Sequence, residues 1–209
     1  MQRRSYIERE GFMNIGIDMD GVLTDIQGFN MKHAPEFFMK NFGREVVDEN
    51  PYDIRDVFDC TEEEFVHYWK KHLIKYAITE PARKDARKVV SKLRKEGHKI
   101  YIISKRVFTY RKDFLGLFMR TIVRNWLWRN GIRYEKIVFC DNDIADSKGE
   151  ACRDNKIDVM IDDEIVNIEA IVPVSKVICF DVSYNRNYEA DNVFRAHTWQ
   201  EVYDIIHRL

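Results

Sequence analysis

Asn14-Ile-Gly-Ile-Asp18-Met-Asp20-Gly21-Val-Leu is the stretch of this 209-residue sequence that decides the predicted fold. Its first part, Asn14–Asp18, is a short continuous apolar run, which is typical of a strand in a parallel sheet covered on both faces. Asp18 and Asp20 are two positions apart, so in extended backbone they point to the same side. Gly21 permits a sharp turn where a side chain would crowd a bound group. The stretch predicts a buried strand that presents two acidic groups at one edge of a sheet.

Four more apolar runs have the same character and are interpreted as further strands. They are Lys99–Ser104, Lys136–Cys140, Asp158–Asp162 and Lys176–Asp181. Apolar residues at helical spacing lie between these runs, and the alternation of strands with helices predicts right-handed crossovers. The expected fold class is therefore α/β, with a doubly wound parallel sheet of the Rossmann-like kind.

Residues 25–80 interrupt this alternation. They contain no convincing strand, but they show two or more helical patterns and a capping box at Thr61-Glu-Glu-Glu64. We therefore expect a small helical cap over residues 25–80, inserted directly after the first strand. Residues 1–24 and 81–209 are then expected to form the α/β core.

Polar side chains lie at the C-terminal ends of several predicted strands, at the edge where open α/β sheets bind their ligands. These side chains, with a lysine that precedes the fourth strand, are Asp18, Asp20, Ser104, Lys148, Asp162 and Asp163. Clustered carboxylates raise each other's pKa, and a hard cation offsets this repulsion. Carboxylate, water and phosphate oxygens are the usual ligands of Mg²⁺, so we expect Mg²⁺ as the cofactor.

The spacing of these groups suits the hydrolysis of a phosphate monoester. Asp18 can attack phosphorus and form an aspartyl-phosphate, which is a known form of covalent catalysis. Asp20 can protonate the leaving alkoxide and later deprotonate water. Ser104 and Lys148 are expected to hold the oxygens of the transferred phosphoryl group.

The ordered set of motifs resembles the haloacid dehalogenase-like hydrolases over nearly the whole chain. In chain order, the segments similar to the four family motifs are Asp18-Met-Asp-Gly-Val-Leu-Thr-Asp25, Ser104, Lys148 and Asp162-Asp163. In this superfamily, an Asp at the second acidic position implies a phosphatase rather than a dehalogenase. The resemblance also implies that the metal is held by Asp18, by the backbone carbonyl of Asp20 and by an acidic residue of the fourth motif.

The fourth motif departs from the family pattern G-D-x-x-x-D. That pattern places Asp163 at the metal ligand and Asn167 where the family has a final acid. Asp162 stands in place of the glycine. Asp163 is the expected direct ligand, Asp162 is the alternative, and Asn167 is a supporting residue.

A closer resemblance is to the 5′(3′)-deoxyribonucleotidase type of 5′-nucleotidase. It rests on the D-M-D-G-V-L opening, on the helical insertion and on Ser104-Lys105-Arg106, while Val177–Arg186 is similar to bacterial nucleotidases of that group. The resemblance implies a nucleoside or deoxynucleoside monophosphate as substrate. Lys105, Arg106 and Arg186 are interpreted as supporting site residues. Asn185 and Arg186 follow the fifth strand and could reach the same sheet edge, and the alternative is that they belong to a plain loop.

The substrate expectation depends on an aromatic residue that stacks on the base. Nucleotidases whose base pocket is understood carry an aromatic just after the first motif, where this chain has Ile26. Phe29, Trp69 or Tyr76 would have to supply that contact. Sugar phosphates and other small phosphate esters are therefore the alternative substrates, and a binding protein that has lost turnover is the alternative class.

Composition limits the class of protein further. Charged residues make up 33% of the chain with a net charge of −1, so there is no basic footprint for a nucleic acid polymer. No apolar run approaches membrane-spanning length, and the first ten residues lack the apolar stretch of a signal peptide. Four widely spaced cysteines fit a reducing compartment. We expect a cytoplasmic protein whose partner is a small phosphorylated metabolite.

Some of the candidate site residues also have a simpler interpretation. Lys105 and Lys136 compete with Lys148 for the role of the site lysine, and Lys148 could also be an ordinary surface residue. Asp162 and Asp163 could serve only to cap a helix that starts near Ile165.

Overall fold

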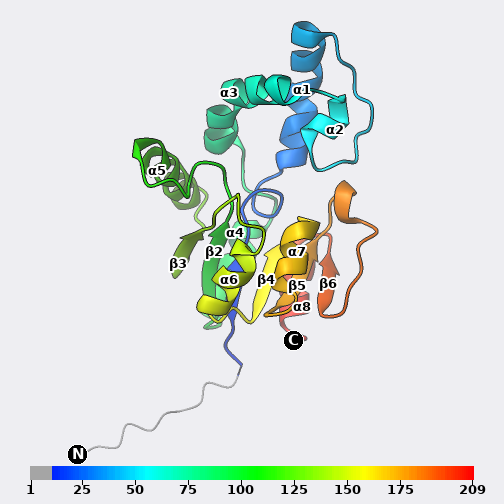
Figure 1. The fold of residues 1–209 in the computed structure, drawn as a ribbon. Helices are drawn as coiled ribbons and strands as arrows, with labels where there is room; N and C mark the ends of the chain where they lie inside the picture. The colour runs from blue at the N-terminus through cyan, green and yellow to red at the C-terminus, as the bar shows by residue number, and fades with distance from the viewer. Residues whose placement is uncertain (1–10) are drawn as a thin grey trace, which may run out of the picture.

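A six-stranded parallel sheet forms the centre of the computed structural model, which describes residues 11–209 (Figure 1). The strand order is β3-β2-β1-β4-β5-β6, and every neighbouring pair is parallel. The strands are β1 Asn14–Ile17, β2 Lys99–Ser104, β3 Lys136–Phe139, β4 Val159–Asp162, β5 Lys176–Phe180 and β6 Val193–Ala196. The predicted fold class is confirmed. The expectations about residues 1–10, as core residues and as lacking a signal peptide, lie outside the described residues.

The sixth strand was not predicted from the sequence. Val193–Ala196 is four residues long, contains an arginine and is mostly half-buried at the sheet edge. It therefore lacks the continuous apolar run by which the five other strands were found.

Helices cover both faces of the sheet. On one face, α4 (Ala86–Lys95), α8 (Trp199–Ile206) and the C-terminal half of α5 (Phe114–Arg129) enclose the larger hydrophobic core. On the other face, α6 (Ser147–Asp154) and α7 (Ile165–Ile171) enclose a smaller one. The direction of the strand order reverses between β1 and β4, and a crevice forms at such a point in doubly wound sheets.

Three helices lie beyond the C-terminal edge of the sheet, at the top of Figure 1. They are α1 (Ile26–Phe42), α2 (Ile54–Phe58) and α3 (Glu62–Thr79), and they share a hydrophobic cluster of their own. The capping box at the start of α3 is confirmed, because Glu64 N–H donates to Thr61 Oγ1 and Thr61 N–H donates to the Glu64 carboxylate. The division into a cap over 25–80 and a core over the rest stays a prediction.

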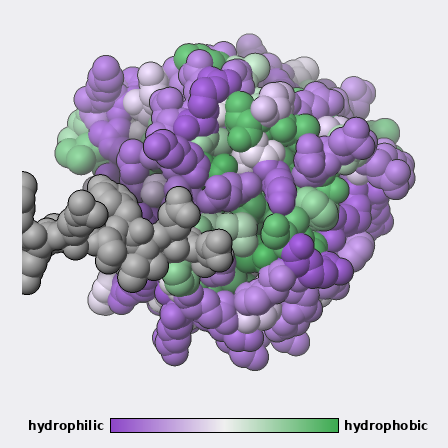
Figure 2. Space-filling view, turned by 90° about the horizontal axis from the view of Figure 1, so that it is seen from below, coloured by the Kyte–Doolittle hydropathy of each residue, from purple (hydrophilic) through white to green (hydrophobic). Residues whose placement is uncertain are grey.

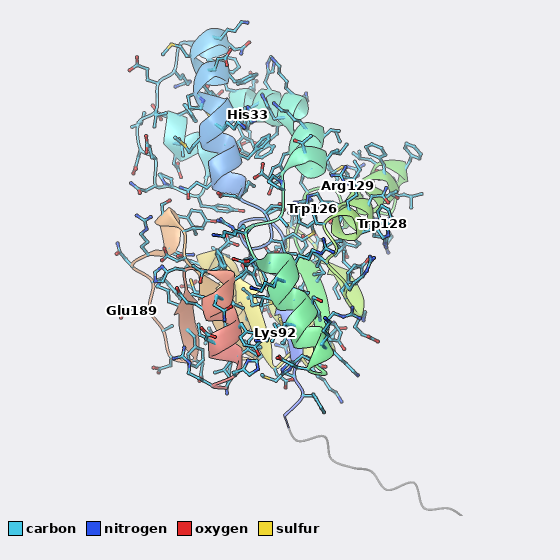
Figure 3. The ribbon with its side chains drawn as sticks, turned by 180° about the vertical axis from the view of Figure 1, so that it is seen from behind. His33, Lys92, Trp126, Trp128, Arg129 and Glu189 are labelled. Carbon is cyan, nitrogen blue, oxygen red and sulfur yellow. The ribbon has the colours of Figure 1, made fainter. Side chains whose placement is uncertain are left out.

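The segment that leads from β1 into these helices lies beside the segment that leads from them to α4. Arg83 N–H donates to Leu23 O at 2.8 Å, and Arg83 Nε donates to Gly21 O at 3.0 Å. Trp126 on α5 donates from Nε1 to Glu80 O at 2.7 Å, at the position labelled in Figure 3. The entry and exit of the inserted helices are thus joined to each other and to the core.

The opposite end of the molecule, where the strands begin, offers a contrasting surface. Figure 2 shows it from below as a mainly hydrophilic face with hydrophobic residues gathered near its centre. Within residues 11–209, no helix has the length and apolar character needed to cross a membrane.

Candidate active site

Three buried carboxylates meet where β1 and β4 end side by side. Asp18 follows β1 and is held to β4 by a 3.0 Å bond from its N–H to Ile161 O, while Asp162 ends β4 and Asp163 follows it. Each of the three can place one carboxylate oxygen within 4.8 Å of the others. The apolar strands bury these acids, as the sequence predicts for the ends of neighbouring strands.

Lys148 on α6 lies between two of these carboxylates. Its Nζ is 2.8 Å from Asp18 Oδ1 and 2.6 Å from Asp162 Oδ2, and its side chain is 1% exposed. Burial disfavours the charged form, but Asp162 and Asp18 hold the pKa of Lys148 well above its usual value. The two alternative lysines bind other groups. Lys105 Nζ donates to Ala145 O, and Lys136 Nζ donates to Asn155 Oδ1. The structure therefore brings Lys148, rather than its rivals, into the cluster.

The carboxylate cluster fits a hard cation. Burial raises the pKa of Asp18 to about 7 against the opposing effect of Lys148, and burial together with Asp162 raises that of Asp163. Asp163 Oδ1 is buried and has no hydrogen-bond partner within the described chain. The space for the Asp163 carboxylate depends on Gly21, because a Cβ at this position, whose φ is 93°, would overlap the carboxylate. An oxygen-only group with excess negative charge and an unpartnered oxygen has the chemistry of a site for a hard divalent cation.

Asp162 has its other bonds at the start of the following helix. Its Oδ1 accepts the backbone N–H of Asp163 at 3.1 Å and that of Glu164 at 3.2 Å, directly before α7. Because Lys148 takes its second oxygen, Asp162 is more fully engaged than Asp163. Asn167 lies beside this network, donating from Nδ2 to Glu164 Oε2 at 2.6 Å. Both N–H groups belong to residues before α7, whose N-cap residue Glu164 makes no side-chain cap bond, so Asp162 shapes the turn before the helix rather than capping it.

Asp20 is clamped by a buried arginine and a tyrosine. Arg106 donates from Nε to Asp20 Oδ2 at 3.0 Å and from Nη2 to Oδ1, while Tyr76 donates its hydroxyl to Oδ1 at 2.5 Å. Burial opposes ionisation, yet Arg106 holds the pKa of Asp20 below its usual value. Ser104, at the end of β2, is fully buried, and its Oγ accepts the N–H of Arg106 at 3.1 Å.

A cavity of about 330 Å³ opens above these groups. Its lining is mostly polar and consists of Asp18, Asp20, Tyr52, Lys105, Arg106, Asn142, Asp143, Ala145, Lys148, Glu164, Val166 and Asn167. Ser104 is not among these residues, and neither are the three aromatic residues expected to stack on a base. Phe29 and Trp69 instead pack against Tyr76, with ring centroids 5.0 and 6.0 Å away.

Two tyrosines at the site were missed by sequence reasoning. Tyr52 supplies the aromatic face of the cavity from the segment between α1 and α2, which has no periodic pattern. Tyr184, in the 3₁₀ helix η1 (Ser183–Asn185), donates its hydroxyl to Asp163 Oδ2, and its ring lies 5.0 Å from that of Tyr52. A signal was available for Tyr184, because it lies in the Val177–Arg186 stretch singled out above.

The two residues expected from that stretch have different positions. Asn185 is fully buried and donates from Nδ2 to Asp163 O at 2.8 Å, so it supports the backbone of the acidic pair. Arg186 is exposed, and its Nε is 3.9 Å from Asp181 Oδ2. The structure therefore brings Asn185 to the site and leaves Arg186 outside the cavity described above.

Comparison with known proteins agrees with this geometry. A family model described as 5′ nucleotidase, deoxy (Pyrimidine), cytosolic type C protein matches residues 12–209. A nucleotidase of Clostridium acetobutylicum is 25% identical over 198 residues, covering 94% of this chain and 95% of that protein. Among solved structures, a predicted phosphatase from Clostridium acetobutylicum has a TM-score of 0.67 at 15% identity, covering 95% of this chain and 100% of its own.

A second solved structure shows the same fold. It is a haloacid dehalogenase family hydrolase from Deinococcus radiodurans with bound phosphate and sodium, and it matches with a TM-score of 0.62 at 14% identity, covering 95% of this chain and 96% of its own. The family match and the arrangement of the acidic cluster lead to one conclusion. The chain belongs to the 5′ nucleotidase, deoxy (Pyrimidine), cytosolic type C family within the haloacid dehalogenase-like superfamily, and it is a phosphatase.

Proposed function

We propose that this phosphatase hydrolyses small phosphate monoesters with Mg²⁺ through an aspartyl-phosphate on Asp18. The observation that carries the proposal is the buried cluster of Asp18, Lys148, Asp162 and Asp163, of which Asp18 and Lys148 line the cavity. Asp18, the backbone carbonyl of Asp20 and Asp163 would hold the metal, which would neutralise charge between the nucleophile and the phosphoryl group.

The protein's own groups account for the bonds that form and break. Asp18 attacks phosphorus and the ester P–O bond breaks, while Asp20 gives its proton to the leaving oxygen. Asp20 then takes a proton from water, which attacks the aspartyl-phosphate and releases phosphate from Asp18. Lys148 opposes the effect of burial on the pKa of Asp18 and so favours the ionised form that attacks. The negative charge of a bound phosphate dianion raises the pKa of Asp20. This rise offsets the lowering of that pKa by Arg106 and favours the protonated acid.

Adding Mg²⁺ is expected to raise the melting temperature of the protein. At a free concentration of about 100 times Kd, binding to the folded state alone stabilises it by about 2.7 kcal/mol. For a chain of this size that corresponds to roughly 5–10 °C, measured by differential scanning calorimetry. Asp163→Asn should abolish the shift, whereas Asp154→Asn, at an exposed position near the end of α6, should retain it. An undiminished shift in Asp163→Asn would contradict this metal site.

Nucleoside and deoxynucleoside monophosphates are the substrate class that we propose first. The family match supports this class, and so does the single tyrosine face in an otherwise polar cavity. Sugar phosphates come second, because the same polar lining suits a hydroxyl-rich group. We place the enzyme in the cytoplasm, in keeping with the four free cysteines.

A phosphatase screen over nucleotides and sugar phosphates at matched concentrations tests both classes. We expect Tyr52→Ala to lower kcat/KM for nucleoside monophosphates by about tenfold, because a base stacked on an aromatic contributes about 1–3 kcal/mol. An aryl phosphate serves as the reference substrate. Tyr110→Ala is the matched control, since Tyr110 is 47% exposed against 46% for Tyr52 but does not line the cavity.

The screen can also reject the substrate assignment. If no nucleoside monophosphate exceeds the aryl phosphate while a sugar phosphate exceeds both, the enzyme is a sugar phosphatase. If no ester is turned over with Mg²⁺ present, the alternative of a binding protein without turnover replaces the proposal.

A further inference from the structure

Arg106 is a fixed cation beside the general acid. Its side chain is 2% exposed, and two of its nitrogens, Nε and Nη2, bind the two oxygens of Asp20. Its guanidinium carbon lies 5.2 Å from the centre of the Tyr76 ring, which packs against it. Because a guanidinium is planar, these contacts also fix the direction of the third nitrogen, Nη1.

That third nitrogen lacks a partner. Arg106 Nη1 is buried and makes no hydrogen bond to any residue of the described part, 11–209, yet Arg106 lines the cavity above Asp18. A buried charged donor without an acceptor is costly, so a donor held in this way indicates that a ligand supplies the acceptor. The cavity that would hold the ligand is the one in which the phosphate ester must react.

The other candidate phosphate-binding groups are engaged in part by the protein. Lys148 Nζ lies between Asp18 and Asp162, Lys105 Nζ donates to Ala145 O, and Ser104 is buried outside the cavity lining. Arg106 therefore offers a positively charged donor that its neighbours leave unused. Charge-assisted bonds from arginine are among the strongest that phosphate oxygens accept.

We propose that Arg106 binds an oxygen of the substrate's phosphoryl group through Nη1 while Nε and Nη2 hold Asp20. One rigid guanidinium then sets the position of the general acid relative to the phosphate. This inference rests on the proposed phosphatase mechanism and adds a phosphate-binding residue to it.

The competing explanation is that Arg106 serves only to neutralise Asp20. The two roles separate in a protein that lacks the Asp20 charge. We would measure the Kd of inorganic phosphate by isothermal titration calorimetry with saturating Mg²⁺ in Asp20→Asn and in Asp20→Asn/Arg106→Met. The double variant should bind phosphate about tenfold more weakly, a factor that corresponds to about 1.4 kcal/mol.

Further variants separate a directed bond from general electrostatics. Lys105→Met in the Asp20→Asn background also removes one positive charge from the cavity lining, and it should weaken phosphate binding less than Arg106→Met does. Asp20→Asn/Arg106→Lys keeps the positive charge but lacks the planar guanidinium with its fixed N–H directions. It should recover only part of the affinity for phosphate. Circular dichroism and thermal unfolding of each variant report whether it is folded.

Each outcome decides the matter. Equal phosphate binding by Asp20→Asn and the double variant overturns the inference, as does an equal loss in the Lys105 variant or a complete loss in Asp20→Asn alone. If the Arg106 double variant proves unfolded, the Lys variant carries the test, and wild-type-like affinity there overturns the directed bond. A wild-type protein that neither binds phosphate nor hydrolyses an aryl phosphate overturns the proposed function itself.

Discussion

Asp18→Asn is expected to lower the turnover of an aryl phosphate by about 10⁴-fold or more, the scale seen when a covalent enzyme loses its nucleophile. The amide has nearly the same shape but cannot form the aspartyl-phosphate. The variant should stay folded, because Lys148 keeps its 2.6 Å contact with Asp162. The measurement is kcat with saturating Mg²⁺, alongside a thermal unfolding curve.

The matched control for this variant is Asp154→Asn. Asp154 lies on the same helix as Lys148, but its side chain is exposed and does not line the cavity. Its kcat should equal that of the wild type. Turnover that survives in Asp18→Asn would refute the covalent mechanism, and turnover that survives strong chelation of the wild type would refute its dependence on Mg²⁺.

Lys148→Met should destabilise the protein by about 3–5 kcal/mol, the usual loss when one partner of a buried ion pair is removed. Methionine fills a similar volume, but it leaves the carboxylates of Asp18 and Asp162 facing each other without a cation. Activity should fall as well, because an unpaired Asp18 is protonated more readily. Urea unfolding gives the free energy of unfolding, and the aryl phosphate assay gives the activity.

Lys136→Met provides the comparison for this loss. Lys136 pairs with Asn155 at an exposed position near the start of β3, so its removal should change stability by less than about 0.5 kcal/mol. A loss of under about 1 kcal/mol in Lys148→Met would show that the buried pairs contribute little to the fold.

The parts of the fold that follow a local pattern could be predicted from the sequence. Five strands were found because each is a continuous apolar run, and the acids at their ends gather because the C-terminal ends of parallel strands share one edge. The last helix shows the limit of such patterns. The pattern Thr198-Trp-Gln-Glu201 is typical of a capping box, and Thr198 does accept the N–H of Glu201, but Glu201 Oε2 accepts the N–H of His197 instead of closing the box on Thr198.

The contacts that complete the site could not be predicted in this way. Tyr52 and Tyr184 come from irregular segments far apart in the chain, and their positions depend on how the inserted helices pack above the sheet. The sequence offers Tyr76 as one of three aromatic residues to stack on a base, yet its hydroxyl binds Asp20. The pairing of Arg106 with Asp20 spans 86 positions, and no spacing rule connects them.

The adjacent connections at residues 21–25 and 80–83 have a consequence for how this enzyme can change over evolution. Because the chain leaves and returns at one point, fixed by the bond from Arg83 N–H to Leu23 O, the inserted segment behaves as a closed loop. Doubling the length of such a loop adds only about 0.6 kcal/mol of closure entropy. Insertions and deletions between the two connections can therefore reshape the selectivity of the enzyme, while the backbone that carries Asp18 keeps its geometry.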